Sequence, residues 1–192
     1  LIFLLEILNK KISTESEVNK YVRAPILGRI VKSPEHGTIL VNKGSRSGLA
    51  ETFRLLRTNL GFVLPKEGAS VIMLTSSISG EGKSFIAANL ASGFALAKKK
   101  VVVVGLDMRK PKLGDIVLGS KFDRSTTGLS NYLAEKANYE AIVMATEREQ
   151  LFMVPSGPVP PNPSELLLEE RLNTLINHLR ADFDIIILDA PP

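Results

Sequence analysis

Three short runs of the chain are apolar at nearly every position, and they constrain the fold more than any other feature. The runs are Val71–Thr75, Val101–Val104 and Ile185–Leu188, with Leu151–Val154 as a further candidate. Strands of this kind are buried on both faces, as in a parallel sheet that helices cover on each side. Segments with helical spacing lie between the runs, so the sequence predicts an α/β domain with a doubly wound parallel sheet.

The segments between these runs carry helix signals. Apolar residues at helical spacing predict a helix over Glu51–Leu64, and an Ala-rich segment predicts a second helix over Lys83–Lys98. After a proline-rich loop at Pro155–Pro163, Ser164 is expected to cap a third helix that ends near Leu179.

The composition excludes several classes of site. The 192 residues are 44% hydrophobic and 23% charged, which is typical of one soluble domain, and none of them is cysteine. Disulfides, thiolate metal sites and a cysteine nucleophile are therefore excluded, and a reducing compartment is expected. A Ser/His/Asp triad would have to use His36 or His178, and neither lies near a recognisable nucleophile turn.

The excess positive charge is concentrated near the N-terminus. Residues 9–50 hold eight basic and three acidic side chains, whereas residues 51–192 hold 16 of each. A nucleic-acid groove on the body of the domain is therefore disfavoured, and we expect no nucleic-acid partner. A basic N-terminal segment is typical of a surface beside anionic lipid.

The two ends of the sequence suggest a fragment. Residues 1–8, LIFLLEIL, are too few to cross a bilayer, which takes about 20 apolar residues. Because basic residues follow at once, they resemble the cytoplasmic end of a transmembrane helix; a buried amphipathic helix is the alternative. We expect a juxtamembrane linker at 9–50 and a phosphate-loop domain at 51–192, which stops after an apolar strand.

A phosphate-loop motif follows the first apolar run. From Ser77 the sequence fits G-x-x-x-x-G-K-[ST] except that serine replaces the first glycine. Gly80 and Gly82 would let backbone amides turn toward phosphate oxygens at a helix N-terminus. Lys83 would reach the β and γ phosphates, and the Ser84 hydroxyl would bind Mg²⁺. The alternative is a glycine-rich turn that binds nothing.

Two aspartates follow apolar strands, Asp107 after VVVVGL and Asp189 at the end of IIILD. Because the carboxyl ends of parallel strands share one edge of the sheet, both can converge on Lys83. Asp189 is placed like the Walker B carboxylate that faces magnesium in phosphate-loop NTPases. Either aspartate taken alone could be an ordinary turn residue.

The motifs together resemble the cytoplasmic domain of the bacterial tyrosine kinases (BY-kinases) of capsule and exopolysaccharide export. The resemblance runs from the apolar stub through Pro192, and its segments are ETFRLLRTNL, SSISGEGKS, VVVVGLDMRKP, PSGPVPPNPSELL and IIILDAPP. It implies an ATP- and Mg²⁺-dependent protein-tyrosine autokinase that regulates polysaccharide synthesis and export.

The resemblance also implies the site residues. Catalytic roles fall to Lys83, Asp107 and Asp189, and metal binding to Ser84, Asp107 and Asp189. Nucleotide contacts are expected from the phosphate loop, namely Ser79, Gly80, Glu81, Gly82, Lys83, Ser84 and Phe85. Asp107 is the candidate for metal contact or for taking the tyrosine proton.

Partners and location follow from the same resemblance. Glu51, Arg54 and Arg57 match the E-x-x-R-x-x-R pattern implicated in a ring-shaped homo-oligomer, although this spacing also suits a solvated, self-paired helix face. Polysaccharide export machinery and a tyrosine phosphatase are the other expected partners. The expected location is the cytoplasmic face of the bacterial inner membrane, held by a transmembrane helix.

The chain departs from the family pattern at two points. The family's D-x-D-x-R has Gly105 in place of its first aspartate, and the only tyrosines, Tyr21, Tyr132 and Tyr139, form no cluster. Two other functions stay open. One is a partitioning-type ATPase, disfavoured because Ile78 stands where those proteins carry a signature lysine, and the other is a nucleotide-controlled export scaffold without phosphotransfer.

Overall fold

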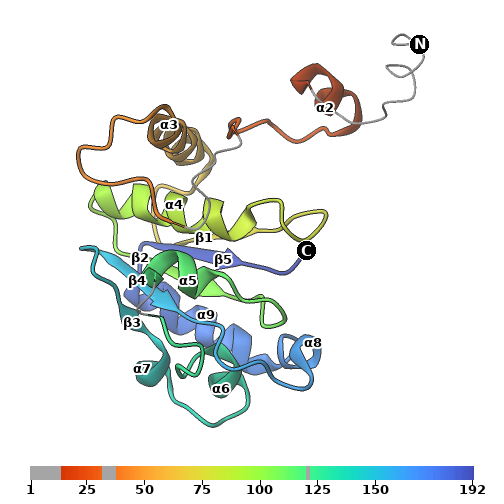
Figure 1. Ribbon diagram of the computed structural model, residues 1–192, viewed down its shortest axis with the longest axis vertical. Helices are drawn as coiled ribbons and strands as arrows, with labels where there is room; N and C mark the ends of the chain where they lie inside the picture. Colours follow the sequence, from red (N-terminus) through yellow and green to blue (C-terminus); the bar gives the residue numbers. More distant parts are fainter. Residues whose placement is uncertain (1–13, 32–37, 120–121) are drawn as a thin grey trace.

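A five-stranded sheet forms the centre of the molecule (Figure 1). The computed structural model describes residues 14–31, 38–119 and 122–192. The strand order is β1-β5-β2-β4-β3, in which the first four strands run parallel and β3 pairs antiparallel with β4. The strands are β1 (Ser70–Leu74), β2 (Val101–Gly105), β3 (Met144–Ala145), β4 (Leu151–Val154) and β5 (Ile185–Asp189).

Helices cover both faces of this sheet, and each face has its own core. One side carries α3 (Gly48–Val63), α4 (Lys83–Leu96) and α5 (Leu113–Leu118); the other carries α6 (Leu129–Leu133), α7 (Tyr139–Ile142), α8 (Pro163–Leu166) and α9 (Glu170–Asp182). Alternate residues of β2 enter the two cores, Val101 and Val103 one and Val102 and Val104 the other. The predicted doubly wound α/β fold is thus confirmed, and burial on both faces explains why the interior positions of β2 and β5 are all apolar.

The third predicted helix is wrong as a single element. Asn162 rather than Ser164 is the N-cap of α8, which ends at Leu166. A separate α9 starts at Glu170, after Glu169 in an extended conformation as its N-cap. The break leaves Leu168 87% exposed while Leu175 is fully buried on the sheet. The segment LLLEER contains no glycine or proline, so nothing local in the sequence marks this break.

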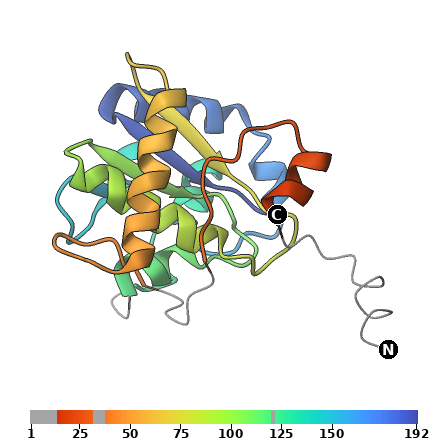
Figure 2. The same ribbon diagram turned by 90° about the horizontal axis from the view of Figure 1, so that it is seen from above.

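The later part of the expected linker packs onto the domain. Ile39 and Val41 are buried, and the Asn89 side chain of α4 accepts hydrogen bonds from the amides of Leu40 (2.7 Å) and Val41 (3.2 Å). Ser47 caps α3, which packs against α4 and crosses it in Figure 2. The division between linker and domain at residue 51 stays a prediction, but packed residues precede it.

The earlier part of this segment holds the helix α2 (Glu15–Tyr21), which buries no residue. The predicted membrane-helix end at residues 1–8 lies outside the described residues. Within the described ranges, no helix is long and apolar enough to cross a bilayer.

We expect Asn89→Ala to lower the free energy of unfolding by about 2 kcal/mol. The side chain is fully buried, and its loss would leave the Leu40 and Val41 amides without their acceptor. Urea unfolding measures the change. Asn59→Ala, which removes an exposed amide that donates to the Leu27 carbonyl, is the control and should cost much less. Equal losses from the two variants would contradict the role given to Asn89.

Candidate nucleotide site

The phosphate loop lies between β1 and α4 and is shaped by two glycines. Gly80 and Gly82 have φ values of 96° and 90°, a region that residues with a Cβ rarely adopt. Gly82 is also the N-cap of α4, and no side chain caps this helix. The first amides of α4 therefore face the loop with the positive end of the helix dipole, as anion binding requires.

The Glu81 side chain stabilises the phosphate loop by hydrogen bonds to amides of the same loop. The Glu81 carboxylate accepts hydrogen bonds from the amides of Ser77 (2.9 Å) and Ile78 (3.4 Å). The Ser76 hydroxyl donates to the Ile78 carbonyl at 3.0 Å. Glu81 therefore shapes the loop, and it is the one predicted loop contact whose residue does not line the neighbouring cavity.

Lys83 and Asp189 form a buried ion pair at the centre of the site. Lys83 Nζ donates to Asp189 Oδ1 at 2.6 Å, and the two side chains are only 8% and 2% exposed. Strand register explains the meeting, since Asp189 is the last residue of β5 and pairs with Leu74 of β1 on one side and Gly105 of β2 on the other. The predicted convergence of these two residues is therefore found in the structure.

Asp107 is held at the same edge by backbone hydrogen bonds. Its own amide and that of Leu106 donate to the Asp189 carbonyl at 3.2 and 3.0 Å. Its carboxylate Oδ1 accepts from the amides of Arg109 and Lys110, both at 3.1 Å. The turn after β2 thus fixes the direction of the Asp107 side chain.

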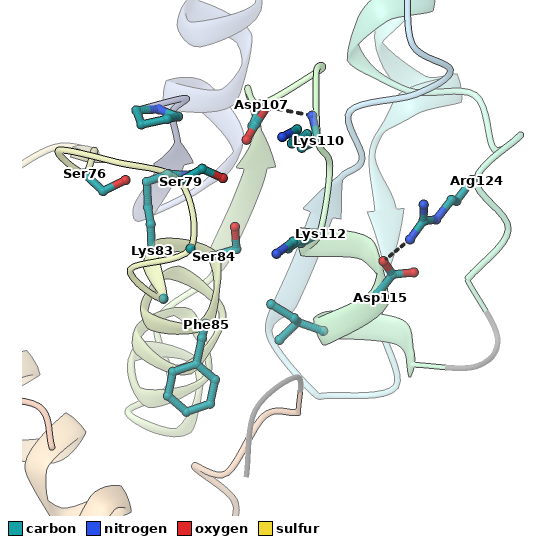
Figure 3. Close-up of a pocket in the computed structure, with 14 residues that line it drawn as sticks. Ser76, Ser79, Lys83, Ser84, Phe85, Asp107, Lys110, Lys112, Asp115 and Arg124 are labelled. Carbon is teal, nitrogen blue, oxygen red and sulfur yellow. Dashed lines mark hydrogen bonds and ion pairs between the residues drawn. The ribbon is translucent and has the colours of Figure 1, made fainter. Parts of the chain in front are cut away.

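A cavity of about 460 Å³ opens between the phosphate loop and the turn after β2 (Figure 3). Lys83, Ser84 and Asp107 line it together, and Asp189 joins them through its ion pair with Lys83. Of the other predicted loop contacts, Ser79, Gly80, Gly82 and Phe85 also line it.

Other residues that the motifs did not predict also line the cavity, namely Lys110, Lys112, Asp115, Ile116 and Arg124. Figure 3 shows Lys112, Asp115 and Arg124 across from Lys83 and Ser84. Arg124 donates to the Asp115 carboxylate at 2.8 Å. Lys110 and Lys112 follow Asp107 closely in the sequence, and this proximity could have indicated that they line the same cavity. Arg124 comes from a distant loop with no motif, so only the folded chain reveals it.

Ser156 occupies the space beside Gly105. Its buried hydroxyl lies within hydrogen-bond distance of the carbonyls of Gly105 (2.9 Å) and Asp107 (3.1 Å), which share its single proton. A Cβ at position 105 would lie 2.5 Å from this hydroxyl oxygen. The glycine and the serine therefore fit together, and both support the turn that carries Asp107.

The three residues of the E-x-x-R-x-x-R pattern have partners within their own chain. Arg54 pairs with Glu51 at 2.8 Å, and Arg57 donates to the Gly93 carbonyl of α4 at 3.1 Å. Glu51 stays 60% exposed. Part of this face thus belongs to the packing of α3 on α4.

The fold and the site define a domain of the phosphate-loop NTPase type. Residues 69–192 match the model of the AAA domain family. The tyrosine-protein kinase YwqD of Bacillus subtilis is 39% identical over 143 residues, which are 74% of this chain and 59% of that protein. The tyrosine-protein kinase wzc of Salmonella typhi is 36% identical over 154 residues, 80% of this chain and 21% of that protein.

Solved structures agree with these relatives. The BceF tyrosine kinase domain is 30% identical with a TM-score of 0.82, covering 95% of this chain and 78% of its own. The cell division ATPase MinD of Pyrococcus furiosus is 28% identical with a TM-score of 0.55, covering 65% and 51%. The chain belongs to the AAA domain family and, within it, to the bacterial tyrosine kinases, and it spans about three fifths of the Bacillus relative.

We expect Ser156→Ala to lower the free energy of unfolding by about 1 kcal/mol, because two buried carbonyls lose the hydroxyl that they share. Chemical denaturation checks this value. Ser164→Ala removes an exposed hydroxyl of the same proline-rich region that accepts a solvent-exposed hydrogen bond from the Arg109 guanidinium, and as the control it should change stability by less than about 0.5 kcal/mol. A Ser156 variant as stable as the parent would show that the hydroxyl does not support the turn.

Proposed function

We propose that the chain is the catalytic domain of an ATP- and Mg²⁺-dependent protein-tyrosine kinase that regulates capsular or exopolysaccharide synthesis and export. The observation that carries the proposal is the buried Lys83–Asp189 pair beside Ser84 and Asp107, at one edge of a parallel sheet. The names of the relatives support tyrosine as the acceptor.

The nucleotide phosphates would be bound by the loop from Ser79 to Phe85. The uncapped amides at the start of α4 offer donors in a fixed arrangement, and Lys83 adds a cation that lies 8% exposed. Phosphoryl transfer depends mainly on positioning and charge stabilisation, which such a loop supplies. When nucleotide binds, the Lys83 ammonium group would form an ion pair with the phosphates and loosen its ion pair with Asp189.

The donor set suits magnesium. The Ser84 hydroxyl and the carboxylates of Asp107 and Asp189 are hard oxygen donors, which Mg²⁺ prefers. Phosphate oxygens and water would complete the coordination shell of the ion. When bound, the ion neutralises charge on the phosphates.

Asp107 would take the proton of the tyrosine hydroxyl. Its Oδ1 accepts two backbone amides, so the carboxylate is held in one orientation on the cavity wall. Because Gly105 has no carboxylate, this function does not have to be shared with a neighbour. The Ser156 hydroxyl stabilises the same turn by donating to the Asp107 carbonyl.

The assembly and location are part of the same proposal. Glu51, Arg54 and Arg57 would contribute to a homo-oligomeric ring. Glu51 is 60% exposed although it pairs with Arg54, so a neighbouring subunit could contact it. Polysaccharide export proteins and a tyrosine phosphatase would be its partners. We place it at the cytoplasmic face of the inner membrane, with the part of the basic segment 9–50 that precedes the packed residues Ile39 and Val41 beside the lipid.

We expect Lys83→Met to reduce phosphate transfer to poly(Glu,Tyr) by about a hundredfold or more, because the cation facing the phosphates is lost. Radiolabelled ATP measures the transfer by the full chain. Lys98→Met removes a surface lysine whose side chain is 75% exposed, and its transfer should match the parent.

Loss of Lys83 also leaves Asp189 buried without a cation, so folding is followed by circular dichroism. Lys83→Arg keeps that charge and should remain folded while transferring slowly. Parental transfer by a folded Lys83→Met protein would overturn the phosphate-loop assignment.

We expect Asp107→Asn to lower kcat for tyrosine phosphorylation about a hundredfold or more, because the amide can neither accept the proton nor replace the carboxylate as a ligand of Mg²⁺. Asp123→Asn changes an exposed turn carboxylate that accepts from Ser125, and it serves as the matched control. A parent protein that binds ATP but labels no tyrosine would instead support a nucleotide-controlled scaffold.

A further inference from the structure

The three tyrosines of the chain differ sharply in access. Tyr132 is 4% exposed in the core of one sheet face, and the Arg171 guanidinium lies 4.6 Å from its ring centre. A hydroxyl that accepts a phosphoryl group must enter the cavity of a kinase. Tyr132 cannot do so while the core around it stays packed.

Tyr139 is also engaged. Its hydroxyl donates to Asp182 Oδ2 at 2.6 Å, and its ring packs edge-on against His178 at 5.3 Å. Burial and the neighbouring Asp182 raise the pKa of Tyr139 well above its usual range. The hydroxyl proton of Tyr139 is therefore held by Asp182. If the side chain left this position, it would lose both the hydrogen bond to Asp182 and the ring contact with His178.

Tyr21 is the exception. It is 78% exposed, and no hydrogen bond to its hydroxyl is found in the described part of the chain. It is the last residue of α2, in which no residue is buried. Figure 1 shows α2 set apart from the sheet and from the helices that cover it.

The helix that carries Tyr21 is easily opened. It has seven residues, and a capping box between Thr14 and Glu17 supports its first turn. Isolated helices of this length are marginal in water, and α2 has no buried face to compensate. Val22, the next residue, is already extended. Tyr21 can therefore be presented on an extended segment without disturbing the domain.

We propose that Tyr21 is a phosphorylation site of this kinase. The proposal rests on the proposed function. The Tyr21 oxygen forms a bond to the γ-phosphorus of ATP, the bond from that phosphorus to the β-γ bridging oxygen breaks, ADP leaves, and the tyrosine proton passes to the Asp107 carboxylate. The added charge then lies at the C-terminal end of α2, where the helix dipole disfavours an anion, so phosphorylation weakens this helix.

The sequence allows each tyrosine to be followed separately. Cleavage after glutamate separates Tyr21 in a fragment of residues 18–35, Tyr132 in 82–135 and Tyr139 in 136–140. After incubation of the full chain with Mg-ATP, mass spectrometry should find phosphate in fragment 18–35 and not in the other two. Tyr21→Phe should remove that signal, and Tyr139→Phe should leave it unchanged.

Poly(Glu,Tyr) in the same reaction separates this proposal from the proposed function. If the polymer is labelled while fragment 18–35 is not, Tyr21 is not a site; if neither is labelled, the kinase assignment fails first. A readout that needs no ATP is nitration by tetranitromethane, which should modify Tyr21 before Tyr132 and Tyr139. Equal nitration of all three tyrosines would also overturn the proposal.

Discussion

The buried ion pair between Lys83 and Asp189 is the interaction on which the site depends. These residues are 106 positions apart, and each is almost completely removed from solvent. A buried charge without its partner costs several kcal/mol, so the phosphate loop and the end of β5 are strongly coupled to one another. The pair also sets the chemistry, because it keeps the Lys83 cation at the cavity wall with the Asp189 carboxylate in contact with it.

The position of β5 in the sheet extends this coupling to the other wall. β5 lies between β1 and β2, so its last residue adjoins both the strand before the phosphate loop and the strand before Asp107. The Asp189 carbonyl accepts the amides of Leu106 and Asp107, and the Ala190 amide donates to the Leu74 carbonyl. One strand end therefore organises both sides of the cavity through backbone hydrogen bonds, which tolerate side-chain changes nearby.

What could be predicted from the sequence was whatever depends on local pattern. Fully apolar strands predicted the parallel sheet, and the loop motif and two strand-end aspartates predicted the convergence on Lys83, because parallel strands present their carboxyl ends on one edge. The break between α8 and α9 and the short helices α5 to α7 were not predictable, since packing rather than local breakers decides them. Arg124 and Ser156 were missed for a related reason, because each reaches the site only through folding of a distant loop.

Gly105 shows how a missing carboxylate is accommodated. A glycine at this position leaves room for the Ser156 hydroxyl, which donates to the carbonyls of Gly105 and Asp107. A neutral hydrogen bond that supports the turn thus lies where the family pattern has the carboxylate of its first aspartate. The site then holds two carboxylates with separate attachments, Asp189 on Lys83 and Asp107 on the amides of its own turn. With fewer negative charges in the cavity, repulsion toward the nucleotide phosphates is smaller. The function of the two remaining carboxylates therefore depends on where they are held. The backbone hydrogen bonds at the end of β5 and the Ser156 hydroxyl hold them there.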